Sequence, residues 1–177
     1  MPRPCHIRGI RRRKTLVLGL GNTILSDDGV GIYVVREIGK RVCFPFVSFQ
    51  EASVGGLELL DLMAGFERVI LIDAVLTQRN KAGTLVPMKV QDVNGGSAMA
   101  RHQVGLYEAL VLGRKLKMNL PARISLYGIE IKDNRTFGES CTADVAAAIP
   151  GIVKTIIRRE RLLPIDGKRA KTETKNA

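Results

Sequence analysis

The chain has 177 residues, 45% of them hydrophobic and 25% charged, which is typical of one globular domain. No apolar run reaches the roughly 18 residues that a membrane span needs, so we expect no membrane insertion. The net charge is +11, but residues 1–14 and 151–177 carry +6 and +5 of it, and the middle is neutral. This distribution disfavours a nucleic-acid-binding groove, although salt-dependent binding by the basic ends remains an alternative.

The charge pattern predicts three segments. Residues 1–13 and 164–177 are expected to be basic, flexible ends, and residues 14–163 a single folded domain. Three cysteines, Cys5, Cys43 and Cys141, are far apart and odd in number. They predict free thiols in a reducing cytoplasm, with Cys43 and Cys141 packed among other side chains.

Strand and helix signals alternate along the chain. The apolar run at 14–20 predicts a strand, followed by a helix at 29–39, a strand at 46–50 and a short helix at 56–65. A continuous apolar run at 68–75 predicts a strand buried on both faces. A fourth strand is expected at 83–90, where Pro87 indicates a sheet edge or a break.

The second half of the chain continues the alternation. We expect a helix at 103–117, a strand at 123–131 and a helical region at 142–163 that Pro150 and Gly151 divide into two pieces. This order predicts an α/β, three-layer sandwich. Its twisted, mostly parallel central sheet would have about five strands, with helices on both faces. Ligands of such sheets bind beyond the carboxyl ends of the strands.

Polar side chains follow several of the predicted strands. They are Asn22, Asp27 and Asp28 after the first strand, Glu51 and the segment 53–56 after the second, Asp73 at the end of the third, and His102 in the loop after the fourth. Of the two histidines, His6 lies in the basic N-terminal segment, so His102 is the histidine of the folded domain.

A nucleotide site fits this pattern poorly. Gly19 and Gly21 follow a strand, but Ile24 stands where a dinucleotide-binding fingerprint has its third glycine. The two adjacent aspartates would also repel a polyphosphate, which binds where exposed N–H groups and positive charge meet.

Two explanations remain for the acidic residues and the histidine. In the first explanation, each side chain has a local structural role. Asp27 and Asp28 would lie at the start of a helix, Asp73 would cap a turn, and His102 would form a hydrogen bond to the backbone. Taken together, Asp28, Asp73 and His102 follow three strands whose ends a parallel sheet brings to one edge. Two carboxylates and an imidazole suit Ni²⁺, Zn²⁺ or Co²⁺, and three protein ligands leave positions open for water or substrate.

Three stretches in order, LVLGLGNTILSDDGVG (16–31), GLELLDLMAGFERVILIDAV (56–75) and HQVGL (102–106), resemble the hydrogenase maturation proteases. The resemblance runs from about residue 14 to 157. It implies an endopeptidase that removes the C-terminal extension of the large subunit of nickel–iron hydrogenases. It also implies one antiparallel strand in the sheet, and a glycine-rich loop near the cleft at residues 53–56.

The resemblance further implies that Asp28, Asp73 and His102 contact the metal and that Asp28 and Asp73 are catalytic. Asp27 is then a helix cap or a group behind the metal ligands. Arg101 departs from the family pattern, in which a small hydroxyl residue is common before the histidine.

Nickel is implied to arrive with the substrate, already held by cysteines of the precursor. The attacking water is activated either on the metal or by a carboxylate base. The partner is then the large-subunit precursor, with no nucleic acid, and we expect a cytoplasmic monomer. The alternative is a non-catalytic, metal-reading chaperone of the same precursor.

Overall fold

The computed structural model describes residues 13–42, 44–90 and 105–162. His102, Arg101, Cys5, Cys43 and, apart from Arg13, the two predicted basic ends lie outside these ranges, so the domain division stays a prediction. Within them, no helix is long and apolar enough to cross a membrane.

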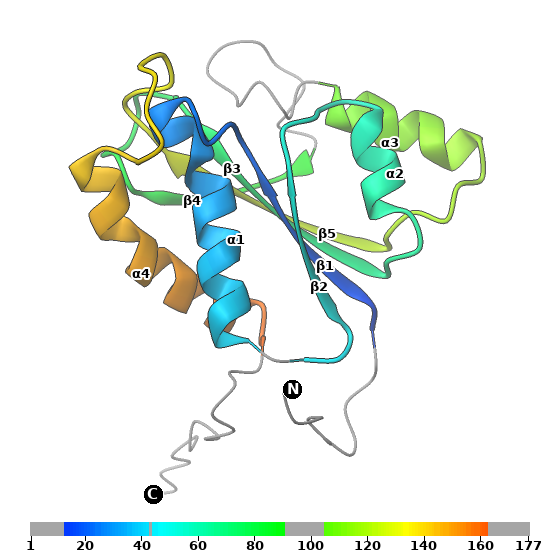
Figure 1. Ribbon diagram of the computed structural model, residues 1–177. Helices are drawn as coiled ribbons and strands as arrows, with labels where there is room; N and C mark the ends of the chain where they lie inside the picture. The colour runs from blue at the N-terminus through cyan, green and yellow to red at the C-terminus, as the bar shows by residue number, and fades with distance from the viewer. Residues whose placement is uncertain (1–12, 43, 91–104, 163–177) are drawn as a thin grey trace, which may run out of the picture.

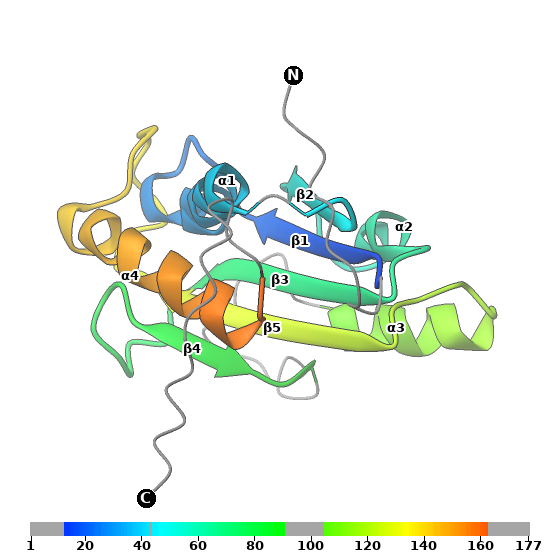
Figure 2. The same ribbon diagram turned by 90° about the horizontal axis from the view of Figure 1, so that it is seen from below.

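Five strands form one sheet in the order β2-β1-β3-β5-β4 (Figure 1). The first four are parallel and β4 is antiparallel to β5, so the β4 arrow in Figure 2 points against that of β1. The α/β prediction with one antiparallel strand is therefore confirmed. The strands are β1 (Thr15–Leu20), β2 (Val47–Ala52), β3 (Arg68–Val75), β4 (Leu85–Met88) and β5 (Arg123–Glu130).

Helices cover both faces of this sheet. Figure 1 shows α1 (Val30–Arg41) and α4 (Ala143–Arg159) on one side, and α2 (Glu58–Met63) and α3 (Leu106–Lys115) on the other. Side chains of successive strand residues alternate between the two layers. In β3, Ile70, Ile72 and Ala74 pack toward α1 and α4, whereas Val69 and Leu71 pack toward α2 and α3.

The edge strand β4 contains Pro87, which pairs with Tyr127 of β5. Proline lacks an N–H and is tolerated at a sheet edge, where its strand needs partners on one side only. The prediction of an edge from Pro87 is confirmed.

The predicted division of the last helical region is wrong. α4 continues from Ala143 to Arg159 with Pro150 inside it. Pro150 and Gly151 lie on the exposed face of the helix. The buried face continues past them through Val145, Ile152, Val153 and Ile156. Packing of this face on both sides of the proline offsets the lost hydrogen bond, so the helix is not divided.

A buried polar cluster joins the end of α4 to the start of β3, at the amino edge of the sheet. The Glu160 carboxylate, 4% exposed, accepts hydrogen bonds from Arg68 and from the Tyr127 hydroxyl. Both terminal nitrogens of Arg68 also donate to the Glu160 carbonyl at 3.1 Å. Desolvation lowers the pKa of Arg68. This cluster fixes the end of α4 at the edge opposite to the predicted site.

Candidate active site

Glycines set how closely α1 approaches the carboxyl ends of β1 and β3. A Cβ on Gly31 would lie 2.4 Å from the carbonyl oxygens of both Leu20 and Ile72. Gly21 has φ +146°, and a Cβ there would lie 2.0 Å from the Asp28 carbonyl oxygen. The glycines of this stretch therefore serve close backbone packing, which agrees with the rejection of a phosphate loop.

Asp28 lies in the short 3-10 helix η1 (Ser26–Gly29) that leads into α1. Its side chain is held at the end of β1 because Oδ2 accepts the N–H of Asn22 at 3.0 Å. The Asn22 side chain shapes the same turn by accepting the N–H of Ile24 at 3.2 Å. Asp28 is 6% exposed, so its carboxylate is mostly shielded from bulk water.

Asp73 is fully buried and lies inside β3, two residues before the strand ends. β3 extends past its last pair with β1, Gly19 with Ile72, and continues along β5, where Asp73 is opposite Gly128. One carboxylate oxygen accepts the N–H of Ala74 at 2.8 Å. Since Ile72 touches Gly31 and η1 contacts β3, Asp28 and Asp73 share one edge of the sheet.

Asp27 has a different role from its neighbour. It is completely buried, and it lies in the first turn of η1, whose N-cap is Leu25. Its Oδ1 accepts the Thr142 N–H at 2.7 Å, and Oδ2 accepts the Thr142 hydroxyl at 3.0 Å and the N–H groups of Asp133 and Lys132 at 3.2 and 3.3 Å. Asp27 thus ties η1 to the loop between β5 and α4. Its partners are more than 100 residues away, so no local pattern could show this role.

Two further segments reach the same edge. The Ser53 hydroxyl donates to the Gly21 carbonyl oxygen at 2.8 Å. Gly105, the N-cap of α3 with φ +80°, lies so that a Cβ on it would be 3.8 Å from the Gly56 Cα. The glycine-rich segment 53–56 and the start of α3 therefore lie close together, near the end of β1. His102 precedes Gly105 by three residues and is outside the described ranges.

Glu51, expected after the second strand, lies inside β2 and is bound to α1. Arg36 Nε and Nη2 donate to its two oxygens at 2.8 and 2.7 Å. This charge-assisted hydrogen bond lowers the pKa of Glu51. Its carboxylate is thereby engaged away from Asp28 and Asp73. In the described part of the chain, no three or more His, Cys, Asp or Glu side chains are grouped as metal ligands.

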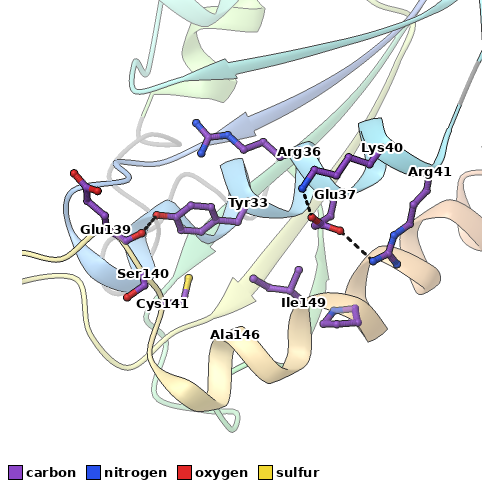
Figure 3. Close-up of a pocket in the computed structure, with 11 residues that line it drawn as sticks. Tyr33, Arg36, Glu37, Lys40, Arg41, Glu139, Ser140, Cys141, Ala146 and Ile149 are labelled. Atoms are coloured by element: carbon purple, nitrogen blue, oxygen red, sulfur yellow. Dashed lines mark hydrogen bonds and ion pairs between the residues drawn. The ribbon is translucent and has the colours of Figure 1, made fainter. Parts of the chain in front are cut away.

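A separate cavity of about 510 Å³ lies between α1, α4 and the loop before α4 (Figure 3). The Tyr33 hydroxyl donates to the Glu139 carbonyl at 2.6 Å, and Glu37 accepts from Lys40 and Arg41. Cys141 is a free, partly buried thiol packed against the core, as predicted. Desolvation raises its pKa to about 12, which suppresses the thiolate at neutral pH. Asp28 and Asp73 do not line this cavity.

A family model described as hydrogenase maturation protease matches residues 32–159. The chain belongs to the hydrogenase maturation protease family. The matched range includes Asp73 and begins four residues after Asp28. The family assignment based on the three sequence stretches is therefore confirmed, and the chain is a hydrogenase maturation endopeptidase.

Individual relatives of this maturation protease agree with the family match. The hydrogenase 2 maturation protease of Escherichia coli is 29% identical over 119 residues, which cover 66% of this chain and 72% of the relative. The hydrogenase expression/formation protein HupD of Rhodobacter capsulatus is 29% identical over 157 residues, covering 86% and 74%. The solved structure of the E. coli hydrogenase maturating endopeptidase HybD superposes with a TM-score of 0.72 at 26% identity, covering 86% and 98%.

Proposed function

We propose that this endopeptidase uses Asp28, Asp73 and His102 to contact nickel in its substrate, and Asp28 and Asp73 for catalysis. As a member of its family, it processes the C-terminus of the [NiFe] hydrogenase large subunit. The observation that carries the proposal is the arrival of two buried carboxylates at one carboxyl edge, Asp28 from η1 and Asp73 from β3. The proposed compartment is the cytoplasm, where the partly buried thiol of Cys141 stays reduced.

The chemistry of the donor set supports nickel. Carboxylate oxygens and one imidazole nitrogen suit a borderline divalent ion. In the proposal the ion is part of the substrate, held by cysteines of the precursor, and the protease side chains complete its coordination. His102 is included in the proposed set on the sequence motif, and Gly105, three residues later, lies beside Gly56 near this edge. Three residues of chain span at most about 10 Å.

With such shared coordination, the protease would act only on precursor that already holds nickel. The scissile bond is positioned only when the loaded precursor engages the two carboxylates, because orientation of the reacting groups supplies much of the rate. A carboxylate of this pair would accept a proton from the attacking water, or the metal of the substrate would lower the pKa of that water so that it loses its proton to solvent.

The experiment uses purified precursor with and without nickel, and the full-length protease. We expect cleavage of the loaded precursor alone, and loss of cleavage in Asp28→Ala, Asp73→Asn and His102→Ala. Glu51→Gln is the matched control, since it removes a carboxylate at the end of β2 that is bound to Arg36. Equal cleavage of nickel-free precursor would disprove the metal-dependent part.

Intact-mass measurement separates this function from the chaperone alternative. A protease reduces the precursor mass by that of the extension, whereas a chaperone gives a stable complex with no loss of mass. Full cleavage by a correctly folded Asp28→Ala variant would show that Asp28 has no role in the proposed site.

A further inference from the structure

Six large hydrophobic side chains are exposed in the described part of the chain: Ile24, Leu57, Tyr107, Leu112, Leu116 and Phe137. Four of them, Ile24, Leu57, Tyr107 and Phe137, lie on loops or first helical turns at the carboxyl edge. Single exposed apolar side chains are ordinary, but a cluster on one rim indicates an interaction surface. Phe137 is 81% exposed and Ile24 is 50% exposed.

Ile24 and Phe137 belong to two loops that are joined by backbone hydrogen bonds. The Gly138 N–H donates to the Ile24 carbonyl at 3.1 Å, and the Ser26 N–H donates to the Gly138 carbonyl at 2.9 Å. These bonds form a parallel bridge between Leu25 and Gly138, which places Ile24 beside Phe137. Ile24 and Phe137 directly precede the two bridged residues, so the neighbouring loops present an exposed apolar pair at this position. We call this pair the 24/137 ridge.

The ridge is held by the same hydrogen bonds that hold the candidate active site. Asp27 accepts from the loop that carries Phe137, and the Asp27 N–H donates to the Asp133 carbonyl at 3.1 Å. On the other side, the turn that carries Ile24 begins at Asn22, whose N–H binds Asp28. Figure 1 shows the loop before α4 beside the segment between β1 and α1. The ridge is therefore continuous with the edge that the substrate must approach.

We propose that the 24/137 ridge docks an apolar surface of the hydrogenase large-subunit precursor next to the scissile bond. The inference rests on the proposed function, because it takes the carboxyl edge as the place of cleavage. An aromatic side chain on a fixed backbone makes an efficient binding anchor, since little conformational freedom is lost when it is covered. The ridge thus contributes to substrate affinity and leaves the chemical step to Asp28 and Asp73.

The test measures cleavage of nickel-loaded precursor by the wild type, Ile24→Ala, Phe137→Ala and the double variant. We expect KM to rise about fivefold or more for Phe137→Ala and further for the double variant, with kcat within about twofold. Phe137→Leu should recover part of the loss. Melting temperatures should stay unchanged because both side chains are exposed. Leu116→Ala is the matched control, as Leu116 is 66% exposed but follows the far end of α3.

Direct titration with the loaded precursor separates this inference from the proposed function. If the wild type binds the precursor without cleaving it, the proposed function fails, and weaker binding by the double variant still supports the ridge. Equal KM and equal Kd for the wild type and the double variant would overturn the ridge. It would also be overturned if the substitutions only converted a dimer of the protease to monomers, because the ridge would then bind a second copy of the chain.

Discussion

At the scale of single residues, the adjacent aspartates show how environment separates two identical side chains. Asp28 lies at the same edge of the sheet as Asp73, and Asp27 is buried beneath the loop before α4. The sequence singled out Asp28 through its family motif. It could not reveal the bonds of Asp27, because Thr142 and Asp133 are distant in the chain. Glu51 was also named as a polar residue near a strand end. Its ion pair with Arg36 could not be foreseen, because no local sequence pattern reveals it.

The four hydrogen bonds of Asp27 predict a structural cost for Asp27→Asn. An amide has one acceptor atom in place of two, so at least one buried N–H or O–H loses its partner. We expect the free energy of unfolding to fall by about 2 kcal/mol in urea titrations. Asp133→Asn is the control, since Asp133 lies on the same loop and is only partly buried, and the Asn side-chain oxygen can still accept the N–H groups of Arg135 and Thr136, so stability should change by under about 1 kcal/mol. A variant of normal stability that no longer cleaves would instead place Asp27 at the reacting groups.

At the scale of elements, strands were easier to predict than helix continuity. β3 was predicted with its observed bounds because a strand buried on both faces is a continuous apolar run. The edge position of β4 followed from Pro87. The break in α4 was wrong because a local rule for Pro150 was applied without knowledge of the buried face that continues past it. Tertiary packing decides such cases, and a sequence pattern alone does not show it.

Pro150 should still reduce the stability of the helix that contains it. Pro150→Ala restores an N–H to the middle of α4 and removes the ring from the preceding turn. We expect stabilisation of about 1–3 kcal/mol, seen by circular dichroism as a melting temperature several degrees higher. Ala147→Gly, also on the exposed face, should lower stability by about 1 kcal/mol and serves as the reference. A lower melting temperature for Pro150→Ala would mean that α4 requires the proline geometry.

At the scale of the whole molecule, the two edges of the sheet differ in role: one carries the candidate active site and the other a buried polar cluster. The carboxyl edge holds Asp28, Asp73 and exposed apolar side chains on loops, as expected for parallel sheets. The amino edge holds the buried pair of Arg68 and Glu160, which the Tyr127 hydroxyl joins from the middle of β5. The sequence predicted the first edge because Asp28 belongs to the segment after β1 and Asp73 lies near the end of β3. It did not predict the second, since Arg68 and Glu160 are brought together only when α4 packs on the sheet.

This division predicts that the amino-edge cluster affects stability and not catalysis. Glu160→Gln leaves the largely buried Arg68 without its counter-charge, so we expect a loss of about 3 kcal/mol in urea titrations. Glu37→Gln removes a more exposed partner of Lys40 and Arg41 and should cost under about 1 kcal/mol. At a temperature where both variants are fully folded, both should cleave the loaded precursor with wild-type kcat and KM. A changed kcat in folded Glu160→Gln would show that the amino edge is coupled to Asp28 and Asp73 through β3, and that the two edges do not work independently.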